Sequence, residues 1–181
     1  MIKLTAFITT VLLATTLNAQ ICKFESITPS QIEGQYLDNR DGTITDIVNG
    51  LVWAKCSVGQ TIVNGECEGD PEGISSWQQA LVKAEELKTI GDYEFRLPNL
   101  KELASLVERA CFDPSINLEA FPSTPSAVYW TNTPDHQVNH DSIKGRIVDF
   151  RDGTEFLTEV NNERYIRLVR KVTDSEVNAT Q

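Results

Sequence analysis

Four cysteines limit how this chain can fold more than any other feature of its sequence; they are Cys22, Cys56, Cys67 and Cys111. An even number of cysteines favours two disulfides in an exported chain, and four cysteines can pair in three ways. A local Cys56–Cys67 bridge is our first choice, because these two residues bracket a loop that contains Gly and Asn. Cys22 would then bridge Cys111 and pin the start of the mature chain to a helix end. A zinc site is the alternative, although no cysteine spacing matches the usual ligand pairs.

The N-terminus predicts that the chain is exported. Residues 1–19 combine a basic start at Lys3, an apolar run over residues 6–14 and a small residue, Ala19, at a suitable cleavage position. This pattern is typical of a signal peptide, and the apolar run is too short to span a bilayer, which takes about 20 residues. We therefore expect a mature chain that starts near Gln20, does not insert into a membrane, and is secreted, periplasmic or displayed at the cell surface.

The mature chain is strongly acidic. Its formal net charge of −10 becomes −11 without the signal peptide, because residues 1–19 contain Lys3 and no acidic residue. An acidic surface repels nucleic acid, anionic lipid and polyanionic sugars in general, so we expect no nucleic-acid partner.

The pattern of apolar residues and turn residues predicts a single α+β domain at residues 35–172. An N-terminal arm, residues 20–34, precedes it, and a polar tail, residues 173–181, is expected to fray after it. Two helices are predicted within the domain. The first spans residues 77–90, and the second runs from a capping box at Asn99 and Glu102 to Cys111. Strands are expected at residues 35–54, 127–133, 146–150, 155–160 and 164–172, with a hairpin turn at Asp152-Gly153.

The stretch YLDNRDGTITD, residues 36–46, has the acids and the glycine of a calcium loop. An EF-hand loop with Gly42 at position 6 needs an oxygen ligand at position 1 and a bidentate acid at position 12. Leu37 and Val48 occupy those two positions. We therefore interpret the stretch as a turn, in which Asn and Asp side chains bond the backbone and Gly42 takes a positive φ.

Both histidines of the chain, His136 and His140, lie four residues apart in DHQVNHD, residues 135–141. On a helix this spacing would suit zinc, but no apolar helical pattern surrounds it, and a solvated loop is the simpler interpretation. The chain has no G-x-S-x-G elbow, no phosphate loop and no H-E-x-x-H. We expect no enzymatic activity, no metal site and no cofactor.

Two kinds of side chain are expected to order the interior. Arg96 and Arg167 are predicted to form buried or half-buried ion pairs with Glu102 or Asp149. Core packing is predicted for the tryptophans, with the stacking of an exposed ring on a sugar as the alternative; they are Trp53, Trp77 and Trp130.

Several motifs together resemble one known family. They are LDNRDGTITDIVNGLVWAKCSVGQTIVNGECEG, SSWQQALVKAEEL, FRLPNLKELASLV, CFDPSINLEAFPSTPSAVYWTNTP, VDFRDGT and YIRLVR. In this order they resemble the Lcl C-terminal domain family, named after the C-terminal domain of a Legionella collagen-like adhesin, over residues 36–171. The resemblance implies a C-type-lectin-like fold related to that of formylglycine-generating enzymes, with a twisted antiparallel sheet. It also implies an exported bacterial protein. The adhesin's domain binds sulfated glycosaminoglycans and assembles as a trimer.

The chain departs from its relatives in ways that bear on function. It has no collagen-like repeat, and its acidity does not suit sulfated sugars. It has no cysteine after Cys111, whereas formylglycine-generating enzymes need paired cysteines near the C-terminus. Calcium-dependent lectins use E-P-N or Q-P-D, where this chain has Leu97-Pro98-Asn99.

We therefore predict a non-enzymatic adhesion domain that binds an extracellular glycan or a surface protein. The ligand is expected to contact the loops at residues 131–146, and trimeric assembly is implied by the resemblance. The predicted contact residues are Trp130, Asn132, His136, His140 and Arg146. The alternative is a structural or assembly subunit of a cell-envelope complex that recognises protein.

Overall fold

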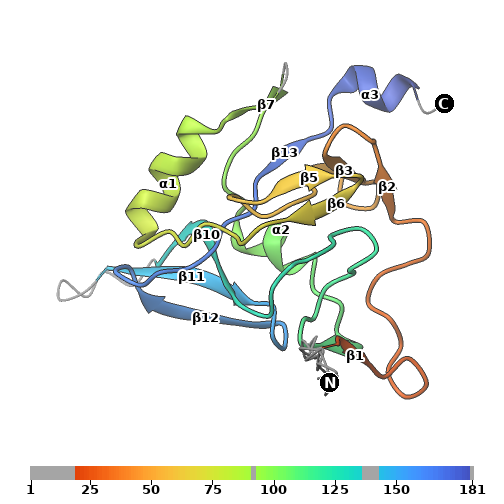
Figure 1. Cartoon of the computed structure of the whole chain (residues 1–181), viewed down its shortest axis with the longest axis horizontal. Coiled ribbons are helices and arrows are strands. Elements are labelled where there is room, and N and C mark those ends of the chain that lie inside the picture. The colour runs from red at the N-terminus through yellow and green to blue at the C-terminus, as the bar shows by residue number, and fades with distance from the viewer. Residues whose placement is uncertain (1–18, 91–92, 136–142, 180–181) are drawn as a thin grey trace, which may run out of the picture.

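A computed structural model describes residues 19–90, 93–135 and 143–179 (Figure 1). The predicted signal peptide lies almost wholly outside the described residues. Within the described part, no helix is long and apolar enough to cross a membrane.

Two antiparallel sheets form the body of the domain, which confirms the α+β class. The larger sheet has the strand order β13–β4–β3–β2, and the smaller has the order β10–β11–β12. Their strands are β2 (Tyr36–Asp38), β3 (Thr43–Asp46), β4 (Leu51–Ala54), β10 (Val128–Pro134), β11 (Lys144–Asp149), β12 (Thr154–Glu159) and β13 (Val169–Lys171).

Three two-stranded ribbons and three short helices complete the described structure. The ribbons pair β1 (Ile21–Cys22) with β9 (Cys111–Phe112), β5 (Thr61–Val63) with β6 (Glu66–Glu68), and β7 (Thr89–Ile90) with β8 (Tyr93–Glu94). The helices are α1 (Trp77–Glu86), α2 (Leu100–Ala104) and α3 (Asp174–Ala179).

Both predicted helices begin where expected and end early. Ser76 caps α1, and the capping box of Asn99 and Glu102 opens α2. The predicted end of the first helix is wrong, because the β-branched pair after Lys88 forms strand β7 instead. The predicted end of the second helix is also wrong. The chain turns after α2, and Cys111 pairs with Cys22 in a ribbon.

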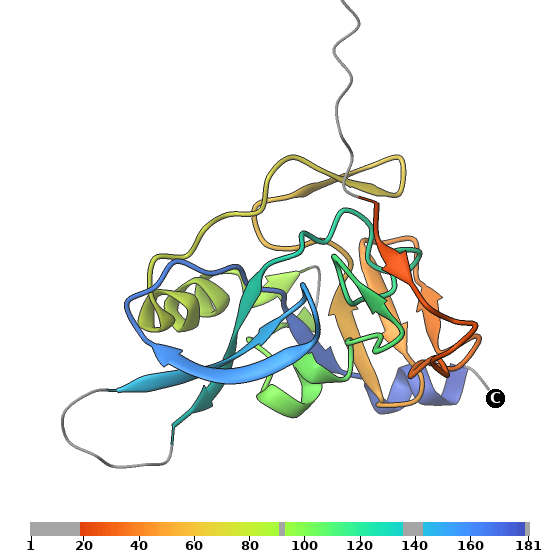
Figure 2. The ribbon, with the colours of Figure 1, turned by 90° about the horizontal axis from the view of Figure 1, so that it is seen from below.

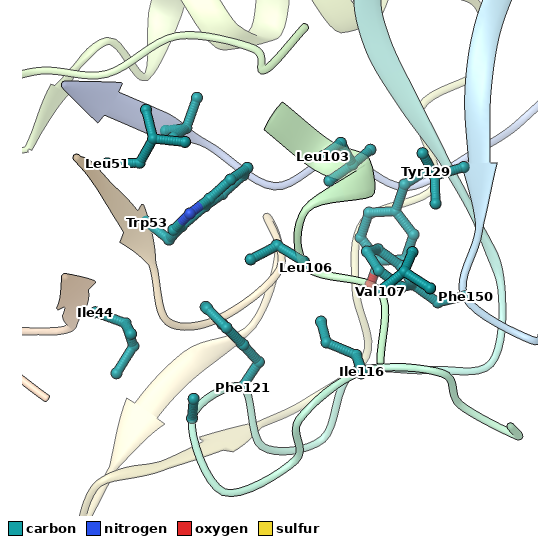
Figure 3. Packing of buried hydrophobic residues seen from close by; sticks show 13 residues of the cluster. Ile44, Leu51, Trp53, Leu103, Leu106, Val107, Ile116, Phe121, Tyr129 and Phe150 are labelled. Atoms are coloured by element: carbon teal, nitrogen blue, oxygen red, sulfur yellow. The ribbon is translucent and has the colours of Figure 1, made fainter. Parts of the chain in front are cut away.

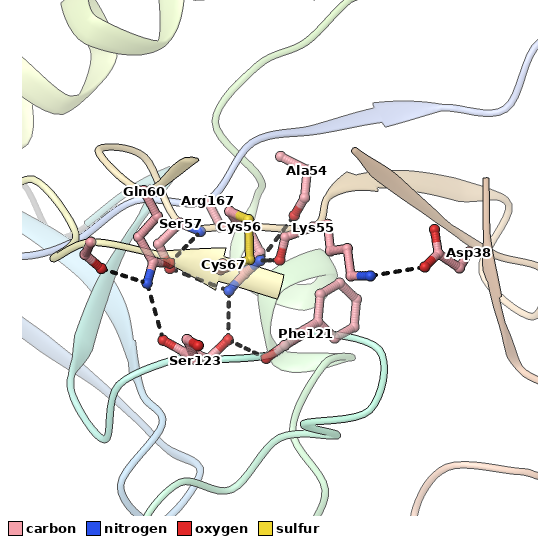
Figure 4. The surroundings of a disulfide bond; sticks show 12 residues. Asp38, Ala54, Lys55, Cys56, Ser57, Gln60, Cys67, Phe121, Ser123 and Arg167 are labelled. Carbon is pink, nitrogen blue, oxygen red and sulfur yellow. Dashed lines mark hydrogen bonds and ion pairs between the residues drawn. A yellow bond between two sulfur atoms is a disulfide. The ribbon is translucent and has the colours of Figure 1, made fainter. Parts of the chain in front are cut away.

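Both disulfides have the pairing that the sequence favours. Cys56 is bonded to Cys67, which ties the β5–β6 hairpin to the end of β4 (Figure 4). Cys22 is bonded to Cys111, which ties the N-terminal arm to β9 across 89 residues of chain. The domain is therefore stapled at its N-terminal arm and at its most exposed hairpin.

The core lies on both faces of strand β4, which explains its continuous apolar sequence. Trp53 belongs to one cluster, in which Leu103 and Leu106 pack between it and Tyr129 of the smaller sheet (Figure 3). Val52, the neighbour of Trp53, belongs to the other cluster, with Trp130, Ile147 and Ile166. These two clusters join the two sheets and the helices into one body.

The closing segment, residues 164–171, connects the two sheets through its backbone. The amide of Trp130 in β10 donates to the carbonyl of Tyr165 (2.9 Å), and the amide of Ala54 in β4 donates to the carbonyl of Leu168 (2.9 Å). Only its last three residues, β13, form a regular strand, which is shorter than predicted. The earlier residues form hydrogen bonds with both sheets in turn, so they do not form a regular strand of either sheet.

Arg167 lies at the middle of the closing segment and is wholly buried. Its guanidinium donates to the carbonyls of Ala54 (2.9 Å) and Lys55, and to the hydroxyls of Ser57 (3.2 Å) and Thr124 (2.6 Å), as Figure 4 shows in part. Burial lowers the pKa of Arg167, because desolvation disfavours the charged form. All of these acceptors are neutral, so the cation is stabilised by dipoles and not by an anion.

The predicted ion pairs are half right. Arg96 forms a two-pronged pair with Glu102, with N–O distances of 2.6 and 2.7 Å. The predicted pairing of Arg167 with Glu102 or Asp149 is wrong, because the acceptors of its guanidinium are the neutral groups described above. The Asp149 carboxylate lies at the β11–β12 turn, where it accepts from the side chain of Arg151 (2.7 Å).

Residues 173–179 of the predicted polar tail carry α3, which an ion pair links to β13. Glu176 of α3 accepts from both terminal nitrogens of the buried Arg170, at 2.6 and 2.8 Å, and from the amide of Thr173 (2.8 Å). The guanidinium also lies 3.9 Å from the ring centroid of Tyr93. These bonds, chiefly that from Arg170, lower the pKa of Glu176 to about 2.

We expect Arg167→Met to destabilise the fold by about 3 kcal/mol, because the substitution leaves several buried acceptors without donors. Arg167→Lys should recover part of this loss, since an ammonium has fewer donors than a guanidinium. Urea unfolding with the disulfides intact measures the effect, and Arg109→Met, at an exposed arginine, is the matched control. A free energy of unfolding within about 0.5 kcal/mol of the wild type for Arg167→Met would contradict this role.

Glu176 should make the stability of the native chain depend on pH. Because its pKa is lower in the folded state, its contribution is complete above the unfolded value, about 4.3, and is lost as the pH falls through about 2. Wild type should therefore exceed Glu176→Gln in free energy of unfolding at pH 6, and the gap should close between about pH 4.5 and pH 2. A gap that does not depend on pH over this interval would show that the charge of Glu176 contributes nothing.

Candidate functional site

Trp77 is the one tryptophan that is not fully buried; Trp53 and Trp130 have no exposed surface. It is the first residue of α1, and its amide donates to the carbonyl of Val160 (2.8 Å). Its indole nitrogen donates to the carbonyl of Thr131 (2.7 Å). The ring is therefore held at a fixed angle between the start of α1 and strand β10.

Gly145 of β11 makes room for this arrangement. A Cβ atom at this position would lie 2.9 Å from a ring carbon of Trp130 and 3.2 Å from the ring of Trp77. Because contacts this short do not occur at ordinary Cβ atoms, only glycine allows both rings to approach β11 so closely. The position of Trp77 thus depends on a residue far away in the sequence.

One face of Trp77 lines a hollow of about 200 Å³, which we call the Trp77 hollow. Its lining is Ser76, Trp77, Gln78, Leu81, Ile143, Val160 and Asn161. Within the described part of the chain, this lining contains no Asp, Glu, Lys, Arg, His or Cys. An aromatic ring and aliphatic groups with a few uncharged polar side chains suit a neutral ligand that has both apolar and hydroxylated faces.

A second hollow, of about 170 Å³, lies on the other side of Leu81, and we call it the Asn132 hollow. Asn132 is fixed there, because its side-chain nitrogen donates to the carbonyl of Leu97 (3.1 Å) and its amide to that of Pro98 (2.7 Å). Arg96 also lines this hollow, and its pair with Glu102 raises the pKa of Arg96.

The charge of Glu102 is also fixed by its surroundings. Burial would raise the pKa of Glu102, but the bonds from Arg96 and from the amide of Asn99 outweigh burial and lower it. The guanidinium in the Asn132 hollow is thus already neutralised by a partner of its own. It is not a free cation for an anionic ligand.

The structure separates the predicted contact residues. Trp130 is fully buried, as the prediction of core packing for the tryptophans has it, and lines neither hollow. Asn132 lines the Asn132 hollow. Arg146 is half-buried opposite Leu157 and lines neither hollow. His136 and His140 lie outside the described residues.

The DNRDGTITD stretch forms the predicted turn. Asp41 accepts from the amide and hydroxyl of Thr43, at 2.9 and 2.6 Å, and Asp38 accepts from the amide of Arg40 (2.8 Å). A bond from the buried Lys55 (2.8 Å), followed by that amide, lowers the pKa of Asp38. Gly42 takes a φ of +93°. These carboxylates therefore accept hydrogen bonds within the turn and from one buried lysine.

A model of the Lcl C-terminal domain family matches residues 42–170. The match begins within the DNRDGTITD turn and ends at Arg170, so it includes both hollows. Neither the curated proteins nor the solved structures that we compared give a match to the chain.

The steric role of Gly145 predicts that its substitution by alanine destabilises the fold. Gly145→Ala should lower the free energy of unfolding by about 1–3 kcal/mol, because the added methyl group displaces two tightly packed indole rings. At an unstrained position, the same change stabilises the folded state by about 0.4–1 kcal/mol, because it lowers the conformational entropy of the unfolded chain. Chemical denaturation followed by tryptophan fluorescence measures the change, with Lys144→Ala on the same strand as the control. A stabilised Gly145→Ala variant would contradict the packing described.

Proposed function

The chain belongs to the Lcl C-terminal domain family, and on that premise we propose that it is an adhesion domain that binds a neutral sugar in the Trp77 hollow. The family associates it with a domain of a surface adhesin. We further propose that it has a C-type-lectin-like fold, acts outside the cytoplasm after removal of a signal peptide, and has no enzymatic activity. Both disulfides support an oxidising location, since such bonds persist there.

The uncharged lining of the Trp77 hollow is the observation that carries this proposal. A tryptophan face stacks on the apolar face of a pyranose, and the amides of Gln78 and Asn161 can bond its hydroxyls. Trp77 is held by bonds to Thr131 and Val160, so a ligand would not have to order the ring.

The charge of the chain favours a neutral sugar over a sulfated one. The net charge of −10 repels polyanions, and the one arginine of the adjoining Asn132 hollow is paired with Glu102. This member of the family would thus differ in specificity from the glycosaminoglycan-binding adhesin domain.

A glycan array followed by calorimetry on residues 20–181 tests the proposal. Neutral hexoses or N-acetylhexosamines should bind, and Trp77→Ala should weaken that binding about tenfold or more, because it removes the stacking face. Phe156→Ala, at an exposed aromatic residue of β12, is the matched control and should change the affinity less than about twofold. Thermal melts establish that each variant is folded.

Two results would overturn the proposal. One is a preference for sulfated over neutral glycans that Trp77→Ala leaves unchanged. The other is the absence of neutral-sugar binding by the folded wild-type chain at millimolar sugar, in a format that presents the sugars multivalently.

A further inference from the structure

A further hollow is lined by residues of the N-terminal arm. The arm and α1 lie on opposite sides of the domain (Figure 2). The hollow has a volume of about 340 Å³, and arm residues line it together with Ile116 and Leu118 of the facing loop. A second hollow of about 260 Å³ continues it towards Tyr36. Both are lined by Ile32, Glu33, Asn117 and Glu119, so we treat them as one surface, the arm groove.

The arm that forms one wall of the groove is held in place along its length. The Cys22–Cys111 bond fixes its start, and the side-chain nitrogen of Gln20 donates to two carbonyls of the facing loop (both 2.6 Å). Further along, the buried carboxylate of Glu108 accepts from the amides of Ser30 (3.0 Å) and Gln31 (3.2 Å). The groove is therefore preformed, and a ligand would not have to order its wall.

Although the arm is so firmly attached, it leaves large apolar side chains in solvent. Phe24 is 56% exposed and Ile32 is 65% exposed, and both line the groove. Ile21 and Ile27 of the same arm are also exposed, at 49% and 40%. A cluster of exposed apolar side chains around a hollow marks an interaction surface, because leaving it in water is unfavourable.

The charge of the groove has one sign. Glu33 and Glu119 are exposed and line both hollows. Within the described residues, neither hollow is lined by Lys or Arg. Two buried polar atoms, the amide oxygen of Gln31 and the hydroxyl of Tyr36, have no hydrogen-bond partner in the described part of the chain. An amide oxygen accepts a hydrogen bond and a tyrosine hydroxyl can donate or accept one, so neither atom supplies positive charge to the groove.

We propose that the arm groove binds an extended segment of a partner protein in which apolar residues are interleaved with Lys or Arg. The apolar side chains would cover Phe24 and Ile32, and the cations would pair with Glu33 and Glu119. This second surface does not depend on sugar binding in the Trp77 hollow. It gives the chain two separate contacts, one for a glycan and one for a protein.

A blocked eight-residue peptide of alternating leucine and lysine tests the proposal by calorimetry with residues 20–181 at low and physiological salt. It should bind more tightly than a leucine–glutamate peptide and than a serine–lysine peptide, because the groove supplies both apolar contact and negative charge. The double variant Glu33→Gln/Glu119→Gln should weaken binding at least fivefold. Glu68→Gln/Glu155→Gln removes the same charge from exposed positions on β6 and β12 and should change it less than twofold.

Other results would overturn the proposal. Equal weakening by both double variants would mean that the peptide only senses net charge. Equal binding of the serine–lysine peptide would mean that the apolar wall takes no part. If the leucine–lysine peptide does not bind, and sedimentation shows self-association that Ile32→Ser abolishes, the groove is covered by a second copy of the chain instead.

Discussion

The buried guanidinium of Arg167 is the interaction on which the rest of the fold depends. It lies in the segment that joins the two sheets, and its donors bind the end of β4, Ser57 and the loop that carries Thr124. A cation without an anion is costly to bury, so every one of its acceptors has to be in place at once. The ring of Phe121 covers the same group, at 5.1 Å from its centroid to the guanidinium carbon. The Cys56–Cys67 bond follows immediately after the carbonyl acceptors and holds the adjoining hairpin against them.

Features that depend on near neighbours could be read from the sequence. The start of α1 at Trp77, the helix cap at Asn99, the turn at Gly42 and the Asp152-Gly153 hairpin each need only residues within one turn or loop. The family match begins within the sequence that forms the Gly42 turn. A short local motif is therefore also part of what identifies the family.

Features that depend on distant contacts could not be predicted in the same way. The predicted end of the second helix at Cys111 was wrong because Cys111 pairs with Cys22, which lies far away in the sequence. Core packing was predicted for Trp77 and Trp130 alike, although only Trp130 is fully buried. Which of them reaches the surface is decided by Gly145 and by the path of β11. The partner of Arg167 was mispredicted because charge suggested a carboxylate, whereas the fold supplies carbonyls and hydroxyls from segments that only meet in three dimensions.

The bond between Cys22 and Cys111 joins residues 89 positions apart, and it holds the start of the arm against the rest of the domain. Two reduced thiols would not hold the arm covalently. The first residues of the arm would then be attached only by hydrogen bonds such as those of Gln20. The wall of the arm groove is thus completed by oxidation, after the polypeptide has been made. In a reducing compartment this wall would lack its covalent support, and only an oxidising compartment supplies it.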